Sequence, residues 1–138
     1  MLGEVGVLSG RLQMGQGLNA RFPLGVVRAR GERSTLVFLE QNSLLPHFGA
    51  VATALTCEHT KPFPDPLYWA AERLGVPVER CLMVGDTTVD IRAGKAAGAQ
   101  TIGVLCGFGS ERELRRAGSD FILQTTADLA QVLLSGDE

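Results

Sequence analysis

A continuous apolar run, CLMVG at Cys81–Gly85, constrains the fold of this chain more than any other feature. A strand with one solvent-exposed face alternates apolar and polar residues, whereas an unbroken apolar strand is typical of a parallel sheet covered on both faces. A helical pattern over Thr88–Ala97 follows directly and ends at Gly98. Because strands that are connected through helices form parallel sheets, we expect an α/β fold.

Short apolar runs alternate with helical patterns from Leu24 to the end of the chain. Asp65 is expected to cap one helix, with Pro66 at its first position and Gly75 at its end. Ser110 and Glu113 have the spacing of a capping box at the start of another helix. The expected strands are Leu24–Val27, 50–55, Cys81–Gly85, 101–105 and 120–123, and the expected helices are 34–45, 65–74, Thr88–Ala97, 110–117 and 127–134.

Size and composition favour one small domain over residues 1–138. The net charge of −2 gives no reason to expect a nucleic-acid or acidic-membrane partner. No signal peptide or membrane-spanning run is recognisable, and the 3 cysteines form no CxxC pair, so we expect a reduced, cytoplasmic protein without a zinc site. Cys57 and His59 are interpreted as ordinary loop residues.

Two aspartates follow the buried strand in the pattern GDTTVD. Ligands of parallel α/β sheets bind beyond the carboxyl ends of the strands, and Asp86 stands at such an end. Asp90 lies in the first turn of the helix that follows, so both carboxylates are expected to face one crevice. Such oxygen ligands suit Mg²⁺, although carboxylates also stabilise the start of any helix through its dipole.

Lys61 precedes three alternating prolines in KPFPDP, which restrict the loop that carries it. Lys61 and Lys95 are the only lysines of the chain, so a lysine in this motif is not drawn from a lysine-rich background. An ammonium group beside a magnesium site would neutralise phosphate oxygens and stabilise the charge that develops during phosphoryl transfer. A solvated surface lysine in a turn is the alternative interpretation.

These motifs resemble those of one family. The segments KPFPDPLYWAAERLGV and CLMVGDTTVDIRAGKAAGAQTIGVLCGFG resemble the haloacid dehalogenase-like (HAD) hydrolases, especially their phosphoglycolate-phosphatase-like branch. The later ERELRRAGSDFIL and ADLAQVLL are similar to the C-terminal end of that branch, and PLGVVRARGERSTLVFLEQNSLLPHFGAVATA is similar to the segment that starts at its second motif. The resemblance covers Leu24 to the C-terminus.

The resemblance implies a three-layer, Rossmannoid parallel sheet and Mg²⁺-dependent hydrolysis of a small phosphorylated substrate through an aspartyl-phosphate intermediate. It implies that Lys61 is a catalytic, phosphate-binding residue that holds the phosphate and the nucleophile. Asp86 would bind Mg²⁺, and Asp90 would ligate the metal or orient its waters. Arg28 stands where the family has a phosphate-binding Thr or Ser; a cation cannot replace that hydroxyl, but it can contact phosphate.

One departure leaves open whether the chain is an enzyme. The family's nucleophile and general acid belong to an N-terminal DxD motif, whereas no aspartate precedes Asp65 here. The interpretation that we favour is an incomplete HAD chain that lacks the cap and the complete N-terminal part. Alternatively, GEVGVL is a degenerate first motif with Gly3 and Val5 at the aspartate positions, and the chain is a non-catalytic relative that binds phosphate or Mg²⁺.

Two other classes share parts of this pattern. A response-regulator receiver domain also combines acidic residues, Mg²⁺ and a Lys-Pro pair, but there the acidic cluster precedes the lysine. A protein-interaction or nucleotide-binding α/β domain is the more general alternative. An incomplete sheet would expose an edge strand, so a homo-oligomer is also compatible with the sequence.

Overall fold

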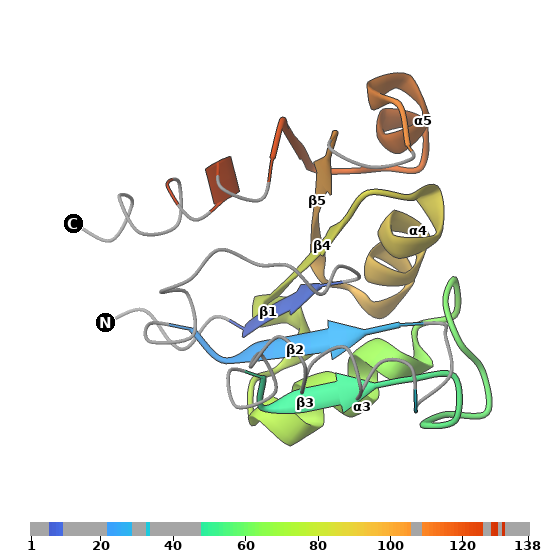
Figure 1. Ribbon diagram of the computed structural model, residues 1–138, viewed down its shortest axis with the longest axis vertical. Coiled ribbons are helices and arrows are strands. Elements are labelled where there is room, and N and C mark those ends of the chain that lie inside the picture. The colour runs from blue at the N-terminus through green and yellow to red at the C-terminus, as the bar shows by residue number, and fades with distance from the viewer. Residues whose placement is uncertain are drawn as a thin grey trace.

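The computed structural model describes residues 6–9, 22–28, 33, 48–105, 109–125, 128–129 and 131. Within them, six strands form one parallel sheet in the order β3-β2-β1-β4-β5-β6 (Figure 1). The strands are β1 (Gly6–Ser9), β2 (Leu24–Val27), β3 (Ala50–Ala52), β4 (Cys81–Gly85), β5 (Gln100–Val104) and β6 (Phe121–Leu123). The helices are α3 (Asp65–Leu74), α4 (Thr88–Ala97), α5 (Glu111–Arg116) and the short 3-10 helix η2 (Val78–Arg80). The expected parallel α/β fold is thus confirmed.

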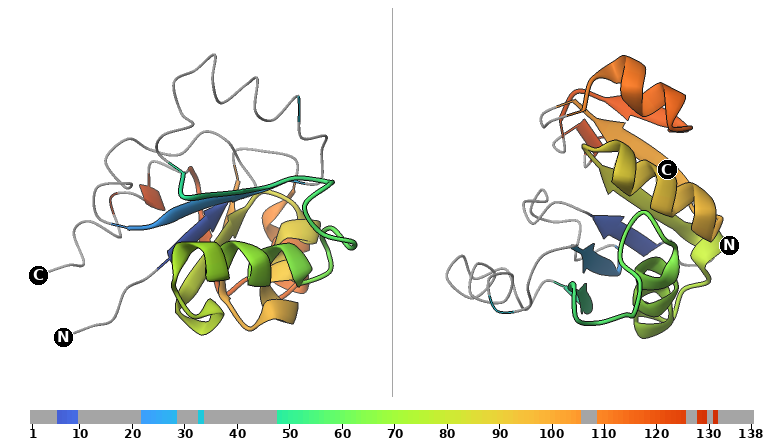
Figure 2. Two further views of the ribbon diagram at one scale, coloured as in Figure 1. Left: turned by 90° about the horizontal axis from the view of Figure 1, so that it is seen from below. Right: turned by 90° about the vertical axis from the view of Figure 1, so that its right-hand side faces the viewer.

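Helices α3, α4 and α5 cover one face of this sheet (Figure 2). On that face, apolar side chains of α3 and α4 pack against the central strands, for example Leu67 and Ala93 against a cluster that includes Met83. On the other face a second cluster contains Val84 of β4 and the buried Leu129, which is helical. Both faces of β4 are therefore buried, as its unbroken apolar sequence predicts.

The sequence patterns identified most of these elements. Strands β2 and β4 and helix α4 have the expected bounds, whereas β3 ends at Ala52, earlier than the expected 50–55. Gly75 and Gly98 end α3 and α4 with positive φ angles of 72° and 87°. The expected helix at 34–45 lies outside the described residues, as does most of the one at 127–134.

The expected cap of α3 was wrong. Pro64 occupies the N-cap position, and Asp65 is the first residue of the helix rather than its cap. The carbonyl oxygen of Pro64 accepts the N–H groups of Leu67 and Tyr68 at 2.9 and 3.1 Å. The Asp65 carboxylate still favours the positive end of the helix dipole, but it lies 3.4 Å from Nδ1 of His59 in the preceding loop.

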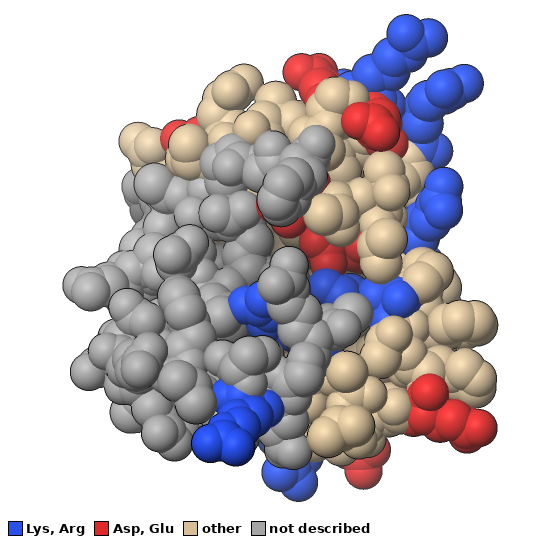
Figure 3. All heavy atoms as spheres, turned by 45° about the vertical axis from the view of Figure 1, so that its right-hand side comes forward, with Lys and Arg blue, Asp and Glu red and all other residues tan. Residues whose placement is uncertain are grey.

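Charges on the surface are mixed in sign where the structure describes them. The exposed helix α5 carries Arg112, Arg115 and Arg116, and Arg115 pairs with Glu111 at 2.8 Å. Figure 3 shows acidic side chains next to basic ones on the face in view, so this face is not a uniform basic patch. No helix in the described ranges combines the length and the apolar character needed to cross a bilayer.

Asp120 connects the start of β6 with β5. Its Oδ2 accepts hydrogen bonds from the backbone N–H and the hydroxyl of Thr101 at 2.8 and 3.0 Å, and its Oδ1 lies 3.3 Å from Nζ of Lys95. The hydrogen bond from the Thr101 backbone is the main reason why the pKa of Asp120 lies below its ordinary value.

A lowered pKa in the folded state links this connection to pH. The ionised Asp120 stabilises the fold above its ordinary, unfolded-state pKa, and this contribution is lost as the pH falls through the lower pKa of the folded state. We therefore expect Asp120→Asn to lower the free energy of unfolding at pH 7. Between pH 7 and pH 3, the free energy of unfolding should fall less in this variant than in the wild type. Urea unfolding at both pH values tests this, with the exposed Glu111→Gln as the control; equal acid sensitivity of wild type and Asp120→Asn would contradict it.

Candidate functional site

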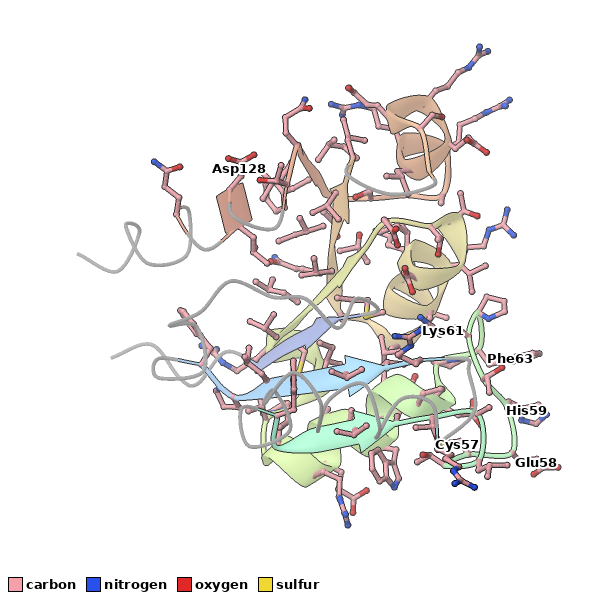
Figure 4. All side chains as sticks on the ribbon, viewed as in Figure 1. Cys57, Glu58, His59, Lys61, Phe63 and Asp128 are labelled. Atoms are coloured by element: carbon pink, nitrogen blue, oxygen red, sulfur yellow. The ribbon has the colours of Figure 1, made fainter. Side chains whose placement is uncertain are left out.

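The carboxyl ends of the parallel strands carry the polar residues of the candidate site. Arg28 follows β2, the buried Thr53 follows β3, and Asp86 follows β4. Since all strands run in one direction, these residues lie at the same edge of the sheet. Figure 4 shows Lys61 at this edge, between the end of β2 and the start of α4.

Lys61 and Asp90 form a buried ion pair at this edge. Nζ of Lys61 contacts Oδ1 of Asp90, although 29 positions separate the two residues in the sequence. The side chains are only 8% and 3% exposed. Burial removes the hydration of both charged groups, and the attraction between the ammonium group and the carboxylate offsets that cost. The structure therefore brings together Lys61 and Asp90 as the sequence led us to expect.

Thr87 fixes the second oxygen of Asp90. Its hydroxyl donates to Oδ2 of Asp90 at 3.0 Å and accepts the Asp90 backbone N–H at 3.3 Å, which makes Thr87 the N-cap of α4. Both oxygens of Asp90 are therefore engaged by protein groups. The sequence analysis did not identify Thr87, although T-x-x-D at the start of a helix is a capping signal comparable to S-x-x-E at Ser110.

Gly85 gives Asp90 the space that it occupies. A Cβ atom at position 85 would lie 2.2 Å from Cβ and 2.3 Å from Oδ2 of Asp90, well inside van der Waals contact. The last residue of β4 is therefore a glycine for a steric reason. The carboxylate of Asp90 thus lies between the end of β4 and the first turn of α4.

Asp86 is the second carboxylate of this edge and is 9% exposed. Its backbone carbonyl accepts the N–H of Gly109 at 2.8 Å, so Gly109 lies against the end of β4. Within the described ranges, no three His, Cys, Asp or Glu side chains are grouped to hold a metal. An aspartate carboxylate is nevertheless the hard oxygen donor that Mg²⁺ takes from a protein while it keeps waters or phosphate oxygens elsewhere.

Arg28 and the end of β1 complete this edge. The backbone N–H of Arg28 donates to the carbonyl of Ala52 at 2.9 Å, which continues the pairing of β2 with β3 beyond Val27. Strand β1 lies between β2 and β4, and its last residue, Ser9, is in register with Val84. The chain reaches this carboxyl end at Ser9, whereas Gly3 and Val5, the aspartate positions of the alternative first motif, lie outside the described residues.

The loop before α3 presents Lys61 to this edge. Oγ1 of Thr56 accepts the backbone N–H of Thr53 at 2.8 Å, which tightens the turn after β3. The centroids of the His59 and Phe63 rings lie 4.9 Å apart, and His59 also pairs with Asp65.

Burial and, to a lesser extent, the Asp65 charge raise the pKa of the Cys57 thiol, so this cysteine is not activated as a nucleophile.

The chain is similar to one family throughout this region. A family model described as haloacid dehalogenase-like hydrolase matches residues 5–104. The pyrophosphatase PpaX of Bacillus pumilus is 33% identical over 112 residues, which are 81% of this chain and 52% of that protein. The phosphoglycolate phosphatase of Escherichia coli K12 is 33% identical over 111 residues, which are 80% of this chain and 44% of that protein.

Solved structures agree with this similarity. A predicted phosphoglycolate phosphatase from Haemophilus somnus shares the fold with a TM-score of 0.78 at 24% identity, over 86% of this chain and 53% of that one. A hydrolase from Pseudomonas syringae has a TM-score of 0.76 at 26% identity, over 84% and 54% of the two chains. The chain spans about half the length of the relatives that it matches.

The contact of Gly85 with Asp90 yields a prediction about stability. Gly85→Ala should lower the free energy of unfolding by about 1–3 kcal/mol, because the new methyl group must displace a buried carboxylate or the strand itself. Gly49→Ala is the matched control, since its Cβ would meet Cδ2 of Leu74 at 2.9 Å, the far end of a flexible side chain. Denaturant unfolding of both variants measures the difference; equal losses would show that Asp90 moves aside without cost.

Proposed function

The chain belongs to the haloacid dehalogenase-like hydrolase family, and we propose that it carries the lysine- and carboxylate-bearing part of a Mg²⁺-dependent phosphomonoesterase site. The observation that supports this most is the buried pair of Lys61 and Asp90 beside Asp86, at the edge of the sheet where ligands of such folds bind. Relatives named phosphoglycolate phosphatase and pyrophosphatase favour a small phosphorylated substrate.

In this proposal Lys61 binds the phosphate. Asp90 holds the ammonium group in place, and the second oxygen of Asp90 is itself fixed by Thr87. The ammonium group of Lys61 is already in position when a phosphate oxygen approaches this edge. Such preorganisation is the condition for effective electrostatic stabilisation. Arg28, at the end of the neighbouring β2, is a second candidate for contact with the phosphate.

Asp86 is the residue that we assign to Mg²⁺. Asp90 is less suited to direct ligation, because one of its oxygens contacts Lys61 and the other accepts from Thr87. When bound, Mg²⁺ supplies positive charge to the phosphate oxygens. We therefore assign Asp90 to the lysine and Asp86 to the metal, a narrower role for Asp90 than the two expected from the resemblance.

A non-catalytic phosphate- or Mg²⁺-binding role is the second candidate, and one observation favours it. Covalent phosphoryl transfer needs a carboxylate nucleophile and a group that protonates the leaving oxygen. Strand β1 occupies the centre of the sheet and ends at Ser9, and no aspartate precedes Asp65 in the sequence. The two candidates share the binding of phosphate and differ in whether a nucleophile completes the site.

We expect the 138-residue chain to bind phosphate without hydrolysing phosphomonoesters at a rate typical of this family. The assay uses p-nitrophenyl phosphate with Mg²⁺, together with equilibrium binding of inorganic phosphate. Lys61→Ala should abolish phosphate binding, whereas Lys95→Ala should leave it unchanged, because Lys95 is 46% exposed and pairs with Asp120. Turnover that is lost in Lys61→Ala and kept in Lys95→Ala would reveal a nucleophile and decide for the phosphatase; absence of phosphate binding would contradict both candidates.

Mg²⁺ should bind weakly, since one assigned carboxylate leaves most positions of the ion to water or phosphate. Calorimetric titration with Mg²⁺ should give a weak signal that increases in the presence of phosphate and disappears in Asp86→Asn. Asp128→Asn is the control, because Asp128 lies away from Lys61 in Figure 4. Tight binding that survives Asp86→Asn would overturn the assignment of the metal to Asp86.

A further inference from the structure

Two helices of this chain begin with the same pair of residue types, a hydroxyl at the N-cap and a carboxylate three positions later. At α5 the pair closes on itself. The Ser110 hydroxyl donates to Oε1 of Glu113 at 3.0 Å, and it accepts the Glu113 backbone N–H at 3.2 Å. The same Oε1 also accepts the backbone N–H of Ser110 at 3.3 Å, which completes a capping box.

At α4 the first half of this arrangement is repeated and the second half is not. Thr87 donates to Oδ2 of Asp90 and accepts its backbone N–H, at 3.0 and 3.3 Å, as Ser110 does with Glu113. The other oxygen of Asp90 contacts Nζ of Lys61, which belongs to the loop before α3. The carboxylate that would close the box is thus directed to a distant residue.

Side-chain length explains the difference. A glutamate at the third helical position is long enough to reach back to the N-cap backbone, whereas an aspartate is one methylene shorter. Asp90 is also confined by the backbone of Gly85, where an added Cβ atom would lie only 2.2 Å from the Cβ of Asp90. A short carboxylate, held at one oxygen by Thr87, presents its other oxygen to Lys61.

We propose that Thr87 is a positioning residue for Lys61, which acts through Asp90, and that position 90 requires the length of aspartate as well as its charge. The start of α4 is then an incomplete capping box, in which Oδ1 of Asp90 contacts and orients Lys61 and does not reach back to the N-cap backbone. The functional meaning of this inference rests on the proposed role of Lys61 in phosphate binding. The geometric part can be tested without any activity.

The experiment measures the accessibility of Lys61 by acetylation of the folded, full chain with a limiting amount of an N-hydroxysuccinimide ester. Mass spectrometry of peptides gives the ratio of labelling at Lys61 to labelling at Lys95. Lys95 is an internal standard, because the side chains are 8% and 46% exposed and the chain contains no other lysine. The variants are Thr87→Ser, Thr87→Val, Asp90→Glu and, as the control for loss of a helix cap elsewhere, Ser110→Ala.

We expect Thr87→Val and Asp90→Glu to raise this ratio by about tenfold, the effect of losing a hydrogen bond to a charged group. Thr87→Ser keeps the hydroxyl and should have the same labelling ratio as the wild type, and so should Ser110→Ala. Circular dichroism establishes that each variant is folded; should Thr87→Val not fold, the charge-conserving Asp90→Glu decides by the same ratio. A wild-type ratio in folded Asp90→Glu would overturn the proposal, as would a rise in Ser110→Ala equal to that in Thr87→Val.

Inorganic phosphate separates this inference from the proposed function. Protection of wild-type Lys61 by phosphate, and loss of that protection in Thr87→Val, support both. An increased ratio in the variants without protection of the wild type supports the positioning role and contradicts phosphate binding at Lys61.

Discussion

The buried ion pair between Lys61 and Asp90 is the interaction on which the rest of this edge of the sheet depends. Two charges that are withdrawn from water are stable only when their geometry is good and their remaining hydrogen-bonding groups are satisfied. Gly85 provides the space and Thr87 holds the second carboxylate oxygen. The loop before α3 and the first turn of α4 are thereby fixed to one another across the strand ends.

The fold and the position of the site could be predicted because they depend on local patterns. Each of these patterns involves only a few neighbouring residues: an unbroken apolar strand, a glycine at the end of each of two helices, and a hydroxyl three residues before a carboxylate. The parallel sheet then places residues that follow different strands at one edge. This is why Lys61 and Asp90 could be assigned to one site although they are far apart in the sequence.

The details that depend on competition between groups could not be predicted in this way. Asp65 has the residue type of a helix cap, but Pro64 is the N-cap of α3, and the carboxylate of Asp65 lies near His59 instead. Asp90 was expected to ligate a metal or to orient its waters, which stays a prediction; its contacts with Lys61 and Thr87 appear only in the three-dimensional structure. A sequence gives the candidates for a hydrogen bond, whereas packing decides between them.

The contact of Gly85 with Asp90 also has an evolutionary consequence. Loss of Lys61 would leave a buried, unpaired carboxylate at position 90, so a later change of Asp90 to a neutral residue would relieve the fold. A glycine at position 90 would in turn remove the barrier to a larger residue at position 85, because the Cβ atom of Asp90 itself lies 2.2 Å from the place of an added Cβ atom there. The order of changes therefore matters: the second and the third are harmful alone in the intact site, yet tolerated once the preceding change has occurred. Decay of this site would follow a path that starts at the lysine.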